Sequence, residues 1–115
     1  MHELSIAMSI LESLEEEVER TGCGPVAAVH VRIGRLSGVV PEALSAAYEM
    51  AAAETPFERS RLIIEEVPIV IHCDGCDRDQ QVDSAGWLCC PECRRPTAEI
   101  VAGRELEICA LELAI

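Results

Sequence analysis

Two Cys-x-x-Cys pairs constrain this chain more than any other feature of its sequence. Cys73 and Cys76 form the first pair, Cys90 and Cys93 form the second, and thirteen residues separate them. Two-residue spacing lets both thiolates of a pair grip one ion from a tight turn, and two such turns complete a tetrahedron. A redox dithiol or cysteines that only fill a core would explain one pair, but two pairs favour zinc. The pattern predicts a structural Zn(II) with four thiolate ligands and no open position.

Three further cysteines do not belong to this pattern. Cys89 precedes Cys90 directly, so the second pair has two conceivable registers, and we choose Cys90 because it gives the Cys-x-x-Cys spacing. We expect Cys23 to be an exposed turn thiol and Cys109 to be an apolar strand residue, neither with a function. The role of Cys89 stays open.

The composition of the chain changes abruptly at the first cysteine pair. All four aspartates and both glutamines lie in residues 74–83, and few apolar residues accompany them. A segment with so little apolar material needs something other than a core to organise it. We therefore assign residues 69–97 to an inserted zinc-binding domain, and residues 1–68 and 98–115 to a larger α/β domain.

Hydrophobic periodicity outside the insertion predicts two helices and three strands. One helix covers residues 1–20 and a second begins near Pro41, while strands are expected around residues 29–34, 62–67 and 106–113. The apolar stripe of the first helix should comprise Leu4, Ala7, Met8, Leu11, Leu14 and Val18. The last strand should contain a bulge or be buried on both faces. The predicted fold class is α+β, an α/β-type sandwich in which two helices pack on a small three-stranded sheet, with the inserted zinc-ribbon-like module.

Charge and missing motifs exclude several classes of protein. The net charge is −12, and all nine basic residues are arginine, which excludes a phosphate-loop lysine and a Schiff-base lysine. So acidic a chain is a poor match for nucleic acid. We expect a cytoplasmic protein without a membrane segment or a secretory signal. We also expect no enzyme, because there is no Ser/His/Asp set, phosphate loop or open metal site.

The first three residues, Met1-His2-Glu3, can present several metal ligands at short range. The α-amino group of Met1, the imidazole of His2 and nearby backbone amides supply nitrogen, and planar nitrogen-rich sets suit Ni(II) or Cu(II). Glu3 can add a carboxylate or simply favour the positive end of the helix. By themselves these residues favour the simpler interpretation, a frayed and solvated terminus in which His2 has no function.

The motifs taken together resemble the HypA/HybF family of hydrogenase-maturation nickel chaperones. The resemblance begins with residues 1–5 (MHELS), continues through 31–37 (VRIGRLS) and 62–66 (LIIEE), takes in both cysteine pairs, and ends with 106–108 (LEI). It covers nearly the whole chain in order. It implies that the larger domain is a nickel-binding domain into which the zinc domain is inserted.

The resemblance also implies a function and a nickel site. Met1 and His2 would bind Ni(II), with Glu3 as a contributor, and the protein would be a metallochaperone for nickel insertion into the large-subunit precursor of nickel–iron hydrogenase. A HypB-like GTPase would be its partner, urease maturation proteins are further candidates, and we expect a monomer or a weak homodimer. The alternative is a zinc-ribbon adaptor that mediates protein contacts without nickel transfer; Arg94 and Arg95 are its only basic cluster.

Overall fold

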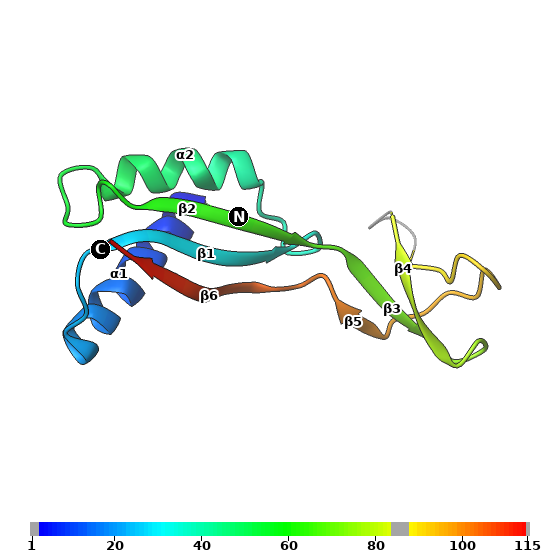
Figure 1. Ribbon diagram of the computed structural model, residues 1–115. Coiled ribbons are helices and arrows are strands. Elements are labelled where there is room, and N and C mark those ends of the chain that lie inside the picture. Colours follow the sequence, from blue (N-terminus) through cyan, green and yellow to red (C-terminus); the bar gives the residue numbers. More distant parts are fainter. Residues whose placement is uncertain (1–2, 84–87, 115) are drawn as a thin grey trace. The chain divides into compact units, whose positions relative to one another are not determined.

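The computed structural model describes residues 3–83 and 88–114. These residues form two helices and six strands, and the strands make up two small sheets (Figure 1). The chain divides into two compact units. The first unit comprises Met1–Val31, Val39–Glu65 and Glu107–Ile115; the second comprises Arg32–Gly38 and Glu66–Leu106. The predicted insertion at 69–97 lies inside the second unit, which also includes residues from the first predicted strand. No helix in the described ranges is long and apolar enough to cross a membrane.

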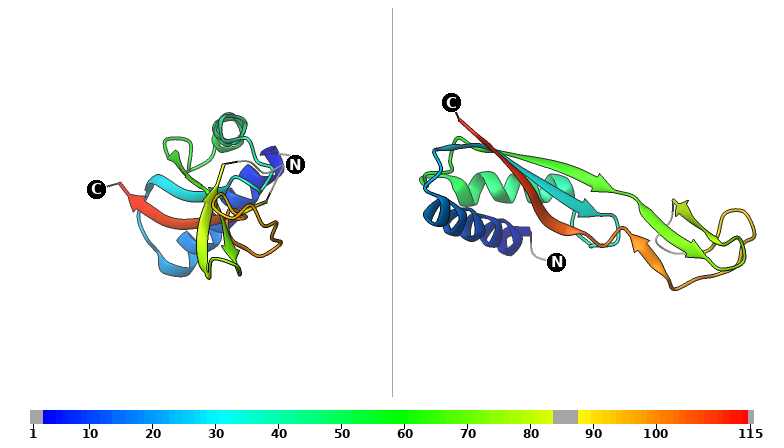
Figure 2. Two further views of the ribbon diagram at one scale, coloured as in Figure 1. Left: turned by 90° about the vertical axis from the view of Figure 1, so that its right-hand side faces the viewer. Right: turned by 60° about the horizontal axis from the view of Figure 1, so that its bottom comes forward.

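The first sheet has the strand order β2-β1-β6 and lies beside the two helices (Figure 2). Its strands are β1 (Val26–Gly34), β2 (Arg61–Val67) and β6 (Leu106–Leu113), and the helices are α1 (Glu3–Thr21) and α2 (Pro41–Ala52). The α+β class, with two helices on a small three-stranded sheet, is therefore confirmed. β1 is the central strand of this sheet and most of its residues are buried, because it has a neighbouring strand on each side and the helices lie beside the sheet.

The buried face of α1 differs in part from the predicted stripe. Ala7, Leu11 and Leu14 are buried as expected, and Ile10 joins them. Leu4 and Met8 are instead 48% and 53% exposed, so the prediction that they face the core is wrong. Residues 7, 10, 11 and 14 follow the i, i+3, i+4, i+7 spacing of one narrow stripe, which leaves positions 4 and 8 at its margin.

The last strand, β6, has the predicted bounds but not the predicted burial. None of its residues is fully buried, and Leu106 and Leu113 are 44% and 46% exposed. The expectation of burial on both faces is wrong because β6 is an edge strand of its sheet. Only Ile108 and Leu111 are half-buried.

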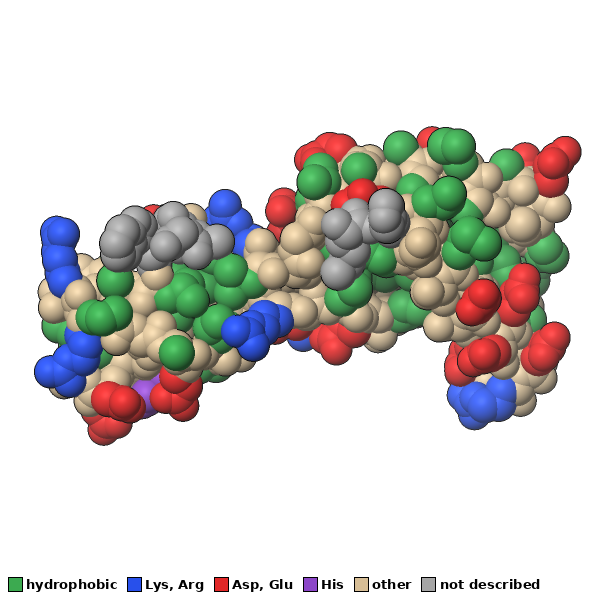
Figure 3. Space-filling view, turned by 180° about the vertical axis from the view of Figure 1, so that it is seen from behind, with side chains coloured by type: hydrophobic (Ala, Val, Ile, Leu, Met, Phe, Trp, Pro, Cys, Tyr) green, Lys and Arg blue, Asp and Glu red, His purple; other side chains and the backbone are tan. Residues whose placement is uncertain are grey.

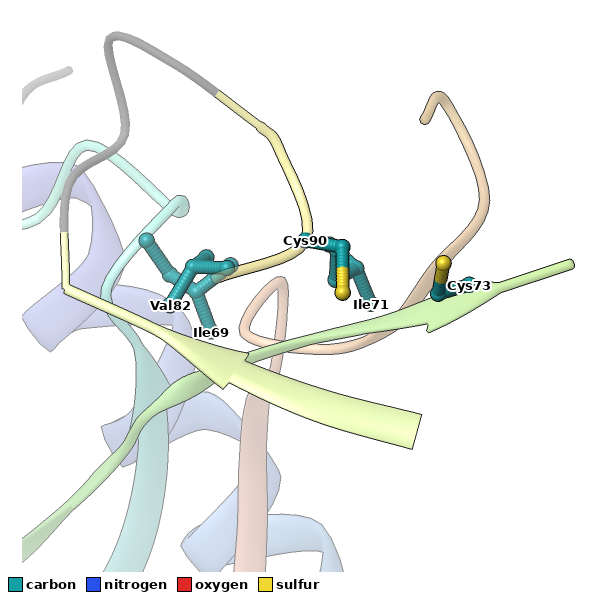
Figure 4. Close-up of a cluster of buried hydrophobic side chains, with 5 residues drawn as sticks. All are labelled: Ile69, Ile71, Cys73, Val82 and Cys90. Carbon is teal, nitrogen blue, oxygen red and sulfur yellow. The ribbon is translucent and has the colours of Figure 1, made fainter. Parts of the chain in front are cut away.

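The second sheet consists of three short strands that sequence periodicity did not predict. Strand β3 (Ile69–Cys73) lies between β4 (Arg78–Val82) and β5 (Ile100–Ala102), and both neighbours are antiparallel to it. One face of this sheet carries a small core, shown in Figure 4. The members of this core are Ile69, Ile71, Cys73, Val82 and Cys90, with Leu36, Cys76 and Leu88 packed against them. Cysteines thus occupy core positions that aliphatic side chains would fill elsewhere.

Two glycines in the second unit bring backbone segments into direct contact. A Cβ atom on Gly34 would lie 2.1 Å from the carbonyl carbon and oxygen of Gly103. Gly103 itself has φ +118°, a conformation that side chains strongly disfavour. The N–H of Leu36 donates to the Gly103 carbonyl oxygen at 2.7 Å, and the N–H of Gly34 donates to that of Glu105 at 2.8 Å. Gly34 is thus required by close backbone approach and not by its own torsion angles.

Candidate metal centre

The four cysteines of the two Cys-x-x-Cys pairs converge in the second unit. All four Sγ atoms lie within 4.8 Å of one another, with 3.4 Å between Cys73 and Cys93 and 3.9 Å between Cys76 and Cys90. A disulfide would need about 2.05 Å, so these separations describe free thiols. Four sulfurs about 2.3 Å from one zinc ion would lie about 3.8 Å apart in a regular tetrahedron. The observed spacing therefore fits a single tetrahedral ion held by sulfur alone.

Local backbone geometry explains why each pair turns its sulfurs inward. The first pair spans the turn between β3 and β4, and the residue after Cys76, Asp77, has φ +50°. The second pair behaves in the same way, because Arg94 follows Cys93 with φ +62°. A left-handed residue directly after the second cysteine reverses the chain, so that the backbone curls around the position of the ion.

Two backbone hydrogen bonds close the second turn. The N–H of Arg94 donates to the carbonyl oxygen of Cys90 at 2.9 Å, and the N–H of Cys90 donates to that of Arg95 at 3.0 Å. Both depend on the chain reversal at Arg94. Cys90 is thereby fixed at 1% exposure in the small core, opposite the similarly buried Cys73.

The thiols influence each other's ionisation strongly. Hydrogen bonding with Cys90, followed by burial, raises the pKa of Cys76 to about 12. The pKa of Cys90 is lowered, chiefly by the backbone N–H of Cys93. Without a cation, Cys90 therefore ionises in preference to Cys76, because the hydrogen bond between them favours one charged and one protonated thiol. A divalent ion reverses that relation and favours the thiolate at every position.

The remaining cysteines lie outside this cluster. Cys89 forms an isolated bridge with Pro96, so the described geometry places Cys90 and not Cys89 among the converging sulfurs. Cys23 lies just after α1 and is half-buried, so the expectation that it is exposed is wrong. Cys109 is exposed on β6, where its Sγ donates to the carbonyl oxygen of His30 at 3.4 Å. The expectation that Cys109 fills an apolar position is wrong, because the edge of the sheet leaves it at the surface.

Of the three predicted nickel ligands, Glu3 is the one that the structure describes. Met1 and His2 lie outside the described residues. Glu3 is the first residue of α1, and its carboxylate accepts a hydrogen bond from the backbone N–H of Val40 at 3.4 Å. Glu3 therefore contacts the segment that leads into α2, a structural role that sequence reasoning did not foresee.

The histidines other than His2 each contact a carboxylate. His30 Nε2 lies 2.9 Å from Glu112, across the first sheet. His72 Nδ1 lies 2.9 Å from Asp79, and this hydrogen bond is the main cause that raises the pKa of His72. This contact could not be predicted from the sequence, because strand β4, which supplies Asp79, was not predicted.

A family model described as "Hydrogenase/urease nickel incorporation, metallochaperone, hypA" matches residues 1–113. The chain belongs to the HypA family. A relative from Chloroflexus aurantiacus named hydrogenase maturation factor HypA is 45% identical over 112 residues, which cover 97% of this chain and 98% of that protein. A relative of the same name from Solidesulfovibrio magneticus is 43% identical over 116 residues, covering 98% and 99% of the two chains.

A solved HypA structure shares the fold. The solution structure of the nickel metallochaperone HypA from Helicobacter pylori matches with a TM-score of 0.69 and 23% identity, over 98% of this chain and 97% of that one. The membership that the sequence motifs predicted is thus confirmed. The HypA family is one of hydrogenase-maturation metallochaperones, and the four-cysteine cluster resembles a zinc site.

Proposed function

We propose that this protein binds Ni(II) at its N-terminus and delivers it to the large-subunit precursor of nickel–iron hydrogenase. The observation that carries the proposal is membership of the HypA family over residues 1–113, combined with the Met1-His2-Glu3 start. The ligands would be the Met1 amine, the His2 imidazole, intervening backbone nitrogens and the Glu3 carboxylate. Such a set is rich in nitrogen and suits Ni(II).

The zinc ion of the proposal is structural and is held by Cys73, Cys76, Cys90 and Cys93. The mutual sulfur spacing supports this assignment, as does the burial of two of the four thiols in the small core. A four-thiolate shell has no position for a substrate, so the proposal gives the protein no catalytic step. X-ray absorption of zinc-loaded protein should show sulfur-only ligation near 2.3 Å. Nitrogen or oxygen in the zinc shell would contradict the assignment.

The proposal includes a HypB-like GTPase as partner, because the chain has no lysine and no phosphate loop for an energy-dependent step. Exposed apolar side chains beside the N-terminus support a protein contact there. Leu4 and Met8 share one face of α1 and are about half-exposed, and Val40, which contacts Glu3, is 52% exposed. A cytoplasmic location is part of the proposal, since a reducing compartment keeps clustered cysteines available to a metal.

Calorimetry with Ni(II) on untagged protein tests the nickel site. The His2→Ala variant, and a variant extended by several glycines before Met1 so that His2 lies far from the free amine, should both bind Ni(II) far more weakly, because each loses a nitrogen ligand. His30→Ala is the matched control, since it removes an imidazole of the same unit whose ring lies 2.9 Å from Glu112. Equal nickel affinity in all these proteins would contradict the N-terminal site and favour the zinc-ribbon adaptor.

Glu3→Gln separates the two roles of Glu3. A glutamine retains an oxygen that can accept from the Val40 N–H but loses the charge that a cation attracts. If the carboxylate is a nickel ligand, the variant should lose part of the nickel affinity while its unfolding curve stays unchanged. An unchanged affinity would leave Glu3 with its structural contact alone.

A further inference from the structure

The second unit carries a group of potential metal ligands on the face of β3 opposite the thiols. Along β3 the buried residues Ile69, Ile71 and Cys73 alternate with Val70 and His72, so His72 projects away from the small core. The ring of His72 and the carboxylates of Asp74 and Glu99 bring their ligand atoms within 4.8 Å of one another. This group shares no residue with the four-cysteine cluster.

Backbone pairing fixes the positions of these residues. His72 is the register partner of Asp79 on β4. On the other side of β3, the N–H of His72 donates to the carbonyl oxygen of Glu99 at 3.0 Å, and Thr97 Oγ1 donates to the carbonyl oxygen of His72 at 3.1 Å. The imidazole thus sits between two neighbouring segments whose acidic residues are held in register with it. A site built on paired strands is held more exactly than one on free loops.

The hydrogen bond to Asp79 orients the imidazole. Asp79 Oδ1 lies 2.9 Å from His72 Nδ1, which turns Nε2 toward Asp74 at 3.7 Å and Asp77 at 4.0 Å. A carboxylate on one ring nitrogen, with the other nitrogen free for a cation, is the usual arrangement around histidine ligands of metals. Ligands about 2.1 Å from one ion lie about 3.0 to 4.2 Å apart, and the distance from Nε2 to Asp74 falls in that interval.

The local charge also favours a cation. Four carboxylates (Asp74, Asp77, Asp79 and Glu99) surround one imidazole, and no arginine forms an ion pair with any of them in the part of the chain that the structure describes. The nearby Arg78 pairs with Glu92 instead. Figure 3 shows acidic side chains gathered beside a histidine at the surface. The side chain of His72 is 27% exposed, so the group is open to solvent and to exchange of an ion.

We propose that His72, Asp74 and Glu99 form a second, exchangeable site for a divalent transition ion of the Ni(II) or Zn(II) class. One imidazole with carboxylates suits such ions, whereas Mg²⁺ and Ca²⁺ prefer oxygen alone. Asp79 is the positioning residue that holds the ring. The open, solvent-facing ligand set makes this site weaker than the closed four-thiolate shell. The inference does not depend on the proposed N-terminal site.

The test uses full-length, zinc-loaded His2→Ala protein, so that neither the N-terminal site nor the thiols compete for the probe. Ni(II) is added in a calorimeter and in an NMR titration, where bound paramagnetic Ni(II) broadens nearby signals. We expect one weak binding event, unaffected by excess Mg²⁺, with broadening centred on His72, Asp74 and Glu99. Absence of nickel binding to this protein, or broadening elsewhere, would overturn the proposal.

Two further variants locate the ligands. His72→Ala and Glu99→Gln, each in the His2→Ala background, should weaken Ni(II) binding by about tenfold or more. Asp83→Asn is the matched control, since it removes one carboxylate of the same unit outside the group and should leave affinity unchanged. Zinc content and the amide spectrum are measured for every variant, so that loss of folding is recognised; Glu99→Gln is the decisive variant if His72→Ala loses zinc. Unchanged nickel affinity in Glu99→Gln would overturn the assignment. If unsubstituted protein binds Ni(II) no better than His2→Ala, the N-terminal site fails while this one stands.

Discussion

The two units of this protein have cores of different size and composition. The first unit buries large aliphatic and aromatic side chains such as Leu14, Leu44 and Tyr48 between helices and sheet. The second has short strands and a small core in which Cys73 and Cys90 take aliphatic positions. Hydrophobic burial scales with apolar area, so the second unit has little to offset its loss of chain entropy. Its four converging thiols could hold a metal ion, and the proposed zinc would supply the difference.

The two units also differ in net charge. The first unit contains thirteen acidic residues and three arginines, a net −10, whereas the second contains eight and six, a net −2. Self-repulsion therefore concentrates in the unit with the larger core, which can tolerate it. Thiolates bound to zinc would add a net −2 to the second unit, and its lower starting charge leaves room for that addition.

Metal removal should have the largest effect, and this effect should be confined to the second unit. In Cys76→Ser protein, or after chelation, we expect amides of β3, β4 and β5 to lose hydrogen-exchange protection while those of α1, α2 and β1 keep it. Structural zinc contributes about 10 to 16 kcal/mol in zinc-finger peptides, far more than this small core supplies. Cys89→Ser is the matched control and should retain zinc and protection. Full protection of the second sheet without metal would show that its core is sufficient.

Truncating a core side chain of the first unit should lower the stability of the protein without releasing zinc. Leu44→Ala removes a side chain with 0% exposure and should lower the free energy of unfolding by roughly 3 kcal/mol. Leu4→Ala, at a 48% exposed position, should change it much less. Chemical denaturation of both variants measures the difference. Zinc content should stay at the level of the unsubstituted protein, and a coupled loss of zinc would show that the units are not energetically separate.

The contact between Gly34 and Gly103 tests what holds the second unit together. Gly34→Ala drives a methyl group into the Gly103 backbone, and overpacking of this kind costs about 1 to 3 kcal/mol. Gly24→Ala is the control, since a Cβ there meets nothing within 4 Å. Hydrogen exchange should show the loss of protection centred on residues 33–36 and 103–105. An unperturbed Gly34→Ala protein would mean that this close approach does not hold the second unit together.

The smallest predicted effect concerns the second metal turn. Arg94 has φ +62°, a conformation that a β-branched side chain tolerates less well than arginine does, so Arg94→Val should destabilise the turn slightly, while Arg94→Gly should relieve its strain. Zinc release to a competing chelator measures both variants against the original protein. Similar release from the valine and glycine variants would show that the arginine side chain, and not the backbone conformation, matters at this position.

The sequence was sufficient for elements with a long periodic pattern. Both helices, β1, β2 and β6 were predicted close to their observed bounds, and spacing alone identified the four converging cysteines. The second sheet was missed because β4 (Arg78–Val82) has the composition of a loop and is a strand only through its pairing with β3. The face of α1 was misplaced for a related reason, since Leu4 and Met8 are apolar but lie at the margin of the contact with the rest of the unit.

The surroundings of His72 could not be predicted for the same physical reason. Asp79 and Glu99 lie 7 and 27 positions away along the chain, and only strand pairing brings both to one histidine. No local sequence pattern predicts that these three side chains come together. Glu3 is the opposite case, because its place in the chain was recognised and its contact with Val40 was not.

The interleaving of the two units along the chain has a consequence for protein synthesis. The first unit receives its edge strand β6 from residues after 106, whereas the second unit ends at Leu106. The ribosome delivers the chain from its N-terminus at about 5 to 20 residues per second, so every cysteine of the metal cluster emerges before β6 does. The nascent chain can therefore acquire its zinc while the first sheet is still incomplete.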